Sequence, residues 1–370
     1  MGSLNKLFIT GATGFLGGAI LAQLLNEGRI NEVLLLVRAG TVDEGLKRIT
    51  DQLRLFELPE ALIATVGPDN IVLGDLGDAS WGQDPRAQSI RVIINSAAVA
   101  SFGTHPRIWE VNVNDSFTFA KTAAELPGLK RFLHVGTGMA CGVQAESPVS
   151  ECYDVGNQAL HLVPYTHSKA TIEARMRDEL PGLPLVVARP SIVVGHTTLG
   201  CKPSSSIFWV FRMAKVLGEF LCDYDDKIDV IPVDWCAAAL LSLADKPTLE
   251  WNRYHVSAGP ESSCSFREID AALSAALHVP PAENYKHVDF DHMMSRSNEF
   301  PALFGVTDPK LILKAIKLYG GFSALSFIFE NGRLRGEGVP AAPRVVDYLA
   351  LCVETTKDIS LADQMSFDFK

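Results

Sequence analysis

The sequence lacks the patterns that mark several classes of protein. Its seven cysteines, at positions 141, 152, 201, 222, 236, 264 and 352, form neither a C-x-x-C pair nor a metal-ligand spacing. No run of about 18 uncharged apolar residues occurs, so no transmembrane helix is predicted. A secretory signal before the first expected strand is also missing. We therefore expect a cytoplasmic protein with reduced thiols and no bound metal.

Positive charge is scarce as well. Lysine and arginine number 33 against 43 acidic residues, which gives a net charge of −10 and argues against nucleic acid as the main partner. Apolar residues are abundant, at 47% of the 370 residues. That content is enough for a large core in one big domain or in a domain with an appendage.

The first functional pattern is a glycine turn after an apolar run at 6–10. Three glycines spaced three apart lead into an amphipathic helix that stops at Gly28. A helix that begins at such a turn offers backbone N–H groups and its dipole to an anion. A generic strand–turn–helix corner is the alternative, but the context favours a dinucleotide site. The residues expected to contact the dinucleotide are Gly11, Thr13, Gly14, Phe15, Leu16 and Gly17.

Short apolar, β-branched runs alternate with helical patterns through the first half of the chain. Continuous apolar strands of this kind are buried on both faces of a parallel sheet. The alternation predicts an α/β fold with a doubly wound, Rossmann-type parallel sheet. The strands are expected at 33–37, 71–73, 92–94, 132–135 and 185–188, and helices at 110–124 and 168–180.

The second strand ends in Arg38, where an acidic residue would favour NAD. The guanidinium fork of Arg38 suits the 2′-phosphate of NADP, with Lys47 and Arg48 as helpers. The alternative is an arginine in solvent, so NADP(H) is favoured while NAD stays open.

Further cofactor candidates follow the third and fourth strands. Asp75 would accept a hydrogen bond from the adenine amino group or form an Asx turn, and Leu76 follows it. Small residues at 96–98 would let the backbone lie against the cofactor. Asn112 is either an interior polar link or an exposed side chain. The candidates of this group are Asp75, Leu76, Ser96, Ala97, Ala98 and Asn112.

The catalytic candidates are Thr137, Tyr165 and Lys169. Tyr165 and Lys169 are four residues apart on an expected helix, which places the phenol and the ammonium on one face. A nearby cation lowers the pKa of a phenol, and the phenol then exchanges a proton with a reacting oxygen near neutral pH. Thr137, at the end of the fifth strand, would donate to the same oxygen. We expect His134 to be a core residue, and the histidines at 161 and 167 to be exposed.

Together these residues resemble the extended short-chain dehydrogenase/reductase superfamily over residues 6 to about 260. The resemblance implies that Thr137, Tyr165 and Lys169 are catalytic, that Lys169 also holds the nicotinamide ribose, and that the segment after Arg189 lines the nicotinamide. Gly136 departs from the usual serine or threonine. The segment residues concerned are Pro190, Ser191 and Ile192.

Within that superfamily, the chain is most similar to fatty acyl reductases and thioester reductase domains. This narrower resemblance rests on Leu36 to Ala39, the helix around Arg48 to Leu55, the run from Arg189 to Gly195, and Ile228 to Trp235. It implies NADPH-dependent reduction of an acyl thioester, bound to coenzyme A or to an acyl carrier protein, to an aldehyde or an alcohol.

The expected organisation is an NADP-binding domain at 1–195, a substrate-cap insertion at 196–227, a return to the first domain at 228–260, and a mostly helical substrate-binding or lid region at 261–370. The apolar run 207–213 suits an acyl chain, or else packs in a core or a dimer face. Five basic residues would meet the phosphates of coenzyme A or of a carrier, or lie in solvent: Lys310, Lys314, Lys317, Arg333 and Arg335.

Three other functions stay open. One is oxidation or reduction of a ketone or hydroxyl, as in steroid- and flavonoid-type relatives. Another is nucleotide-sugar epimerisation, which the apolar segment 196–227 disfavours. The third is a cofactor-sensing scaffold, which has no need of three intact catalytic side chains. The sequence leaves the substrate and any homo-oligomer undetermined.

Overall fold

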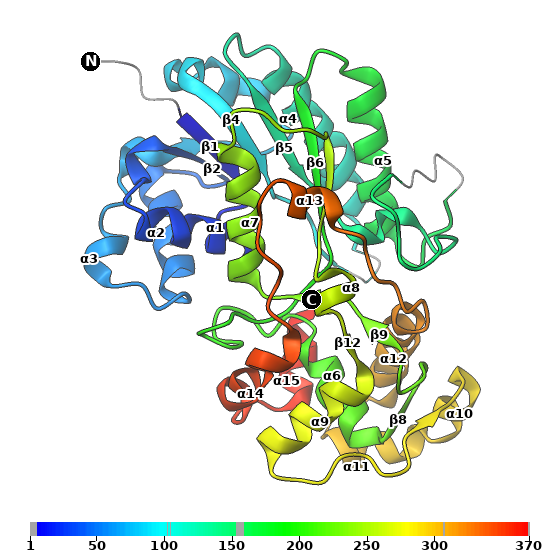
Figure 1. Ribbon diagram of the computed structural model, residues 1–370. Helices are drawn as coiled ribbons and strands as arrows, with labels where there is room; N and C mark the ends of the chain where they lie inside the picture. Colours follow the sequence, from blue (N-terminus) through cyan, green and yellow to red (C-terminus); the bar gives the residue numbers. More distant parts are fainter. Residues whose placement is uncertain (1–5, 102, 104, 153–158, 306–307, 369–370) are drawn as a thin grey trace.

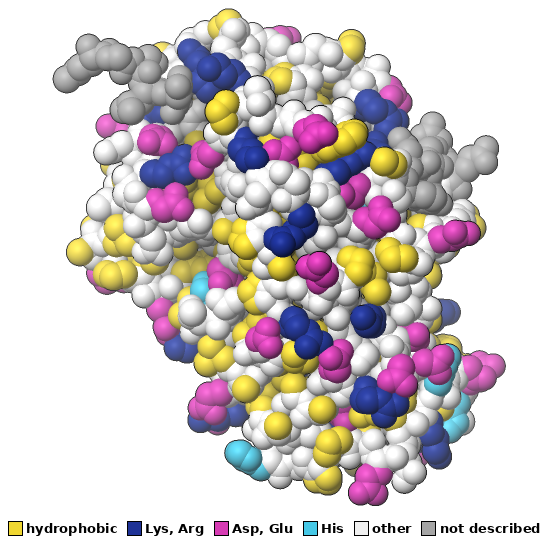
Figure 2. All heavy atoms as spheres, in the orientation of Figure 1, with side chains coloured by type: hydrophobic (Ala, Val, Ile, Leu, Met, Phe, Trp, Pro, Cys, Tyr) yellow, Lys and Arg dark blue, Asp and Glu magenta, His cyan; other side chains and the backbone are white. Residues whose placement is uncertain are grey.

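The computed structural model describes residues 6–101, 103, 105–152, 159–305 and 308–368. Figure 1 shows two regions, a larger one built on a sheet and a smaller, mostly helical one below it. Charged side chains of both signs are interspersed over the face shown in Figure 2. Within the described ranges, no helix is both long and apolar enough to cross a lipid bilayer.

The larger region contains a seven-stranded sheet in the order β11-β6-β5-β4-β1-β2-β3. Every pairing in it is parallel, and the order reverses between β1 and β4, where this architecture binds ligands at the carboxyl ends. The predicted fold class is therefore confirmed. The strands are β1 (Lys6–Thr10), β2 (Val33–Val37), β3 (Ile71–Leu73), β4 (Ile90–Asn95), β5 (Arg131–Val135), β6 (Leu185–Pro190) and β11 (Arg253–Val256).

Alternate residues of the strands enter two different cores, one on each face of the sheet. Ile9 of β1 packs in the core covered by α1 (Phe15–Asn26), α2 (Val42–Arg54) and α7 (Val233–Asp245). Phe8 packs on the other face, with α4 (Ser116–Ala124) and α5 (Pro164–Glu179). Because both faces of the sheet are buried, the strands are mostly apolar, as the sequence indicated. The helix expected at 110–124 starts as a π-helical segment, Glu110–Asp115, before α4.

The smaller region has a separate apolar core formed mainly by four helices. They are α6 (Phe208–Leu217), α9 (Phe266–Leu277), α12 (Pro309–Ser323) and α14 (Val345–Thr356). Most of the apolar run 207–213 is buried in this core, with Phe208, Trp209 and Phe211 at most 3% exposed. For these three side chains the core-packing interpretation is therefore correct.

Shorter elements complete the chain. The helices are α3 (Glu60–Ile63), α8 (Gly259–Ser262), α10 (Phe290–Ser295), α11 (Phe300–Phe304), α13 (Gly332–Gly336) and α15 (Leu361–Asp368). The two-residue strands are β7 (Ile192–Val193), β8 (Glu219–Phe220), β9 (Lys227–Ile228), β10 (Val230–Ile231), β12 (Cys264–Ser265) and β13 (Lys286–His287).

Buried contacts join the two regions. Asp229, between β9 and β10, accepts hydrogen bonds from the backbone N–H groups of Ala258 at 2.7 Å and Phe329 at 3.1 Å. The helix α13 packs against β11, so the chain crosses back over the larger region before it enters α14 (Figure 1). These contacts tie the smaller region to the sheet region.

Candidate active site

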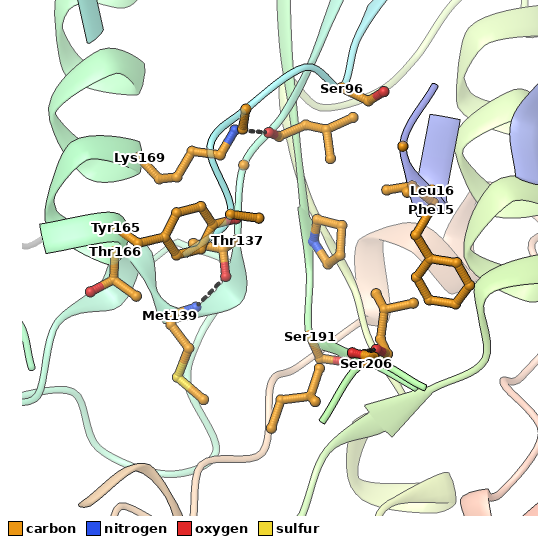
Figure 3. Close-up of a pocket in the computed structure, with 18 of the residues that line it drawn as sticks. Phe15, Leu16, Ser96, Thr137, Met139, Tyr165, Thr166, Lys169, Ser191 and Ser206 are labelled. Carbon is orange, nitrogen blue, oxygen red and sulfur yellow. Dashed lines mark hydrogen bonds between the residues drawn. The ribbon is translucent and has the colours of Figure 1, made fainter. Parts of the chain in front are cut away.

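A cavity of about 340 Å³ lies at the carboxyl edge of the sheet, where the two regions meet. The sheet region supplies its glycine turn and its polar side chains. The smaller region supplies an apolar wall, which includes Ile207 before α6, and Tyr319 and Phe322 of α12. Figure 3 shows Tyr165, Thr137 and Lys169 on one side of the cavity, with Phe15 and Leu16 on the other.

The glycine turn borders this cavity. Gly11 has a φ of +77°, and a Cβ there would lie 2.7 Å from the backbone nitrogen of Ala97. A Cβ on Gly17 would lie 2.2 Å from the carbonyl oxygen of Gly11. Both positions therefore require glycine, and α1 begins directly after Gly14. This geometry fits the pyrophosphate of a dinucleotide, because a first helical turn has N–H groups without intrahelical partners.

Lys169 and Tyr165 reach the cavity from the first two turns of α5. Lys169 is only 3% exposed, and its ammonium donates a hydrogen bond to the carbonyl oxygen of Val135 at 2.6 Å (Figure 3). This bond fixes the lysine at the end of β5. The ammonium is thereby bound two residues before Thr137 in the sequence. Lys169 itself follows Tyr165 by one helical turn on α5.

Burial sets the proton affinities of both groups. It lowers the pKa of Lys169 to about 8, and the carboxylate of Glu173 opposes that shift. It raises the pKa of Tyr165 to about 12, and Glu173 adds to the rise. The pKa of this phenol therefore shifts in the direction opposite to the predicted one, because burial and the carboxylate of Glu173 both raise it. At neutral pH the phenol holds its proton and is ready to donate it.

Thr137 lines the cavity and also caps the short helix that follows it. Its hydroxyl oxygen accepts a hydrogen bond from the backbone N–H of Met139 at 3.3 Å (Figure 3). This bond uses only a lone pair of the hydroxyl oxygen, so the hydroxyl proton remains available for donation into the cavity.

Buried polar groups support the site from behind. Asn112 is 1% exposed; its amide accepts from the N–H of Val99 at 2.7 Å and donates to the hydroxyl of Ser168 at 3.1 Å. It is therefore the interior link and lies outside the cavity lining. His134, a core residue as predicted, contacts Asn95 at 3.3 Å, and burial keeps its pKa well below the usual value.

The remaining cofactor candidates fall into two groups. The cavity is lined by Gly11, Gly14, Phe15, Leu16, Gly17, Ser96, Ala98, Pro190, Ser191 and Ile192. Other candidates lie outside that lining: Thr13, Arg38, Asp75, Leu76 and Ala97. Leu76 is a core residue at 3% exposure. The hydroxyl of Ser96 donates to the carbonyl of Thr10 at 2.7 Å, which holds the loop after β4 beside the turn.

Arg38 and Asp75 lie together at the ends of β2 and β3. The guanidinium of Arg38 is 3.6 Å from the carboxylate of Asp75, whose other oxygen accepts the N–H of Leu76 at 2.8 Å. Arg38 is 60% exposed. Of the two expected helpers, Arg48 contacts the carbonyl of Arg38, whereas Lys47 is paired with Asp51 at 2.5 Å.

One expectation about the side chains near Tyr165 was wrong, and one residue beside it was not predicted. His161 is half-buried, hydrogen-bonded to the hydroxyl of Thr166 at 3.2 Å and stacked on His167, although surface exposure was expected. Glu173 was not singled out from the sequence. Its spacing was a usable signal, because it follows Tyr165 and Lys169 at intervals of four on the same helix. The cavity wall at Tyr319 and Phe322 carried no local signal.

Comparisons with known proteins agree with this geometry. A family model described as "Male sterility protein", of the NAD-binding type, matches residues 9–240. A fatty acyl-CoA reductase of Drosophila melanogaster is 27% identical over 286 residues, which are 64% of this chain and 53% of that protein. An aldehyde reductase of Aspergillus flavus is 27% identical over 68% of this chain and 25% of its own length. The chain thus spans about half or less of these curated relatives.

Solved structures share the fold over almost the whole chain. The terminal R domain from the myxalamid PKS-NRPS pathway aligns with a TM-score of 0.74 and 21% identity, covering 97% of this chain and 92% of that one. A thiolation-reductase di-domain from an archaeal non-ribosomal peptide synthetase gives 0.70 and 20%, covering 96% and 90%. A UDP-glucose 4-epimerase of Thermotoga maritima gives 0.62 and 15%, covering 95% and 99%.

Proposed function

We propose that this chain reduces an acyl thioester with NADPH. The proposal starts from its family: the chain belongs to the Male sterility protein family, of extended short-chain dehydrogenase/reductase type. One observation carries the proposal. A protonated tyrosine, a buried lysine and a threonine hydroxyl from the sheet region face a cavity whose opposite wall is apolar. Such a cavity suits a reactive carbonyl attached to a greasy chain.

The residues around the glycine turn would hold the cofactor. The turn would bind the pyrophosphate, Lys169 the hydroxyls of the nicotinamide ribose, and Arg38 the 2′-phosphate that distinguishes NADPH. The exposure of Arg38 and its distance of 3.6 Å from Asp75 support this role, because a weak exposed pair is easily exchanged for a phosphate. When bound, the nicotinamide supplies the hydride.

The side chains of the chain itself would manage charge on the substrate oxygen. As the carbonyl carbon is reduced, negative charge develops on its oxygen, and the hydroxyls of Tyr165 and Thr137 would donate hydrogen bonds to it. Tyr165 then gives its proton, which its raised pKa keeps in place up to that moment. Cleavage of the carbon–sulfur bond releases the thiol and leaves an aldehyde, which a second reduction would convert to an alcohol.

The thiol carrier would approach from the side of α12. Lys310, Lys314 and Lys317 are exposed on this helix, which also supplies Tyr319 and Phe322 to the cavity wall. They would meet the phosphates of coenzyme A or of a carrier protein's pantetheine. Arg333 and Arg335 are engaged elsewhere, with the carbonyls of Arg253 and Val339, so we leave them out of this role.

A panel of substrates tests the proposal. NADPH oxidation is followed with acyl-coenzyme A, acyl-carrier protein, ketone and sugar-nucleotide substrates, and each is repeated with NADH. We expect turnover of thioesters, faster with NADPH. Turnover of ketones alone would overturn the thioester proposal and favour the steroid- or flavonoid-type alternative. Cofactor binding without turnover of any substrate would favour a cofactor-sensing scaffold.

A further inference from the structure

Tyr165, Lys169 and Glu173 lie at intervals of four residues on α5, and therefore on one face of the helix. Glu173 is as deeply buried as the lysine, at 5% and 3% exposure. A carboxylate this far from water needs strong partners, because the charged form loses its hydration. Its position one turn behind a catalytic candidate makes its environment relevant to the site.

The carboxylate of Glu173 is paired through one oxygen only. Its Oε2 accepts hydrogen bonds from Nε and Nη2 of Arg189, on β6, at 2.9 Å and 2.6 Å. Its Oε1 is buried and has no hydrogen-bond partner within the described part of the chain. An ion pair that served only to join α5 to β6 would be expected to use both oxygens. A buried polar atom without a partner is uncommon and indicates a further role.

The absence of a side chain at Gly136 leaves room for Oε1 of Glu173. A Cβ at position 136 would lie 2.2 Å from Oε1 of Glu173, so any larger residue would displace the carboxylate. Gly136 stands between Val135, whose carbonyl binds the ammonium of Lys169, and Thr137. The unpaired oxygen therefore lies against the backbone segment that holds two groups of the site. The departure from serine or threonine at this position has a structural reason in this chain.

The charges around Lys169 give the carboxylate an electrostatic effect. Lys169 is influenced by its helix neighbour Glu173 and acts on His134 of β5, while Arg189 of β6 is paired with Glu173. Burial lowers the pKa of His134, so this residue is neutral near pH 7. The carboxylate of Glu173 raises the pKa of Lys169 against the effect of burial, and raises that of Tyr165 as well. Both effects favour the proton-bearing forms of the two side chains.

We propose that Glu173 is a positioning residue of the site: its carboxylate, held by Arg189 and admitted by Gly136, keeps the ammonium of Lys169 charged behind Tyr165. The meaning of that charge for catalysis rests on the proposed function. The arrangement of the four side chains does not, so the protein without substrate or cofactor reports on it directly.

The test is a titration of Lys169 in Glu173→Gln, which removes the charge and keeps the shape. Protein labelled with ¹³C at lysine Cε is titrated by NMR, and the Lys169 signal is assigned with Lys169→Met. We expect the pKa of Lys169 to fall by at least about one unit in Glu173→Gln, the size expected when an opposite charge a few ångströms away is lost. The basic limb of the kcat/KM profile should move to lower pH by the same amount.

Glu179→Gln is the matched control, because Glu179 is on the same helix and pairs with Arg175 at 2.8 Å, but at the surface. It should leave the titration unchanged. If Glu173→Gln does not fold with Arg189 unpaired, Glu173→Gln/Arg189→Met removes both buried charges and should give a smaller fall in the same direction, because the repulsion from the guanidinium is lost as well. An unchanged pKa of Lys169 in the folded variant overturns the inference. A shifted pKa without turnover of any substrate overturns the proposed function and leaves the inference standing.

Discussion

The two regions contribute to the cavity in opposite ways. The sheet region brings hydrogen-bonding groups that are each fixed by a backbone contact, such as the ammonium of Lys169 on Val135 and the hydroxyl of Thr137 on Met139. The smaller region brings apolar side chains from α12 and from the start of α6. Under the proposed function, the sheet region would perform the chemistry and the smaller region would select the substrate, so substitutions in each should change different measurements.

The largest effect is expected from Tyr165→Phe, which removes the proton donor from the sheet region. Turnover should fall by about 10²–10⁴-fold, the usual value of a positioned general acid. NADPH affinity, measured by fluorescence quenching, should stay within about twofold of the wild-type affinity, because the phenol acts on the substrate oxygen. Tyr285→Phe is the control, since that phenol bonds to the carbonyl of Cys222 in the smaller region. Unchanged turnover in Tyr165→Phe would remove the proton-donor role.

Gly17→Ala tests the glycine turn. Its Cβ would lie 2.2 Å from the carbonyl oxygen of Gly11, and overpacking of this kind costs about 1–3 kcal/mol. We expect a lower melting temperature and NADPH affinity about tenfold weaker, because the turn must open to make room. Gly182→Ala is the control, as nothing lies within 4 Å of its Cβ position. Equal NADPH affinity in both variants would contradict the assignment of the turn.

Arg38→Gln tests whether recognition of the 2′-phosphate can be separated from catalysis within the sheet region. Loss of a hydrogen bond to a charged group costs about 1.5–3 kcal/mol, so the KM for NADPH should rise about tenfold or more. The KM for NADH should be unaffected. Lys47→Gln, whose ammonium pairs with Asp51, is the control. An equal change for NADH and NADPH would show that Arg38 does not recognise the 2′-phosphate.

The smallest effect is expected from Phe322→Ala, which shortens the apolar wall. Preference among acyl thioesters of different chain length should change by about tenfold, since apolar contacts discriminate by about 1–3 kcal/mol. NADPH affinity should not change. Val216→Ala, exposed on α6, is the control. If Phe322→Ala instead lowered turnover equally for every substrate, the division of labour between the regions would fail.

Local patterns were sufficient for much of the fold. The apolar runs at 33–37 and 71–73 coincide with β2 and β3, and the helix expected at 168–180 overlaps α5, Pro164–Glu179. These patterns were sufficient because the periodicity of apolar residues in strands and helices can be recognised within a short stretch of sequence. The same patterns placed Tyr165 and Lys169 on one helix and Gly11 beside a cavity.

The sequence alone could not give the environment of those side chains. Whether His161 is exposed and whether the pKa of Tyr165 rises or falls depend on burial in the folded chain. Asn112 had two interpretations until its amide was found between Val99 and Ser168. Desolvation and long-range hydrogen bonds have no signature in a local pattern.

The sequence by itself therefore determined the parallel sheet, the glycine turn and the face of α5 that carries the phenol and the ammonium. The burial of these groups and their charged neighbours depended on the tertiary structure. That structure placed Phe322 and Tyr165 in the lining of one cavity and set the carboxylate of Glu173 against Gly136. The physical reason is that element type follows from the period of neighbouring residues, whereas charge and burial follow from packing between segments distant in the chain.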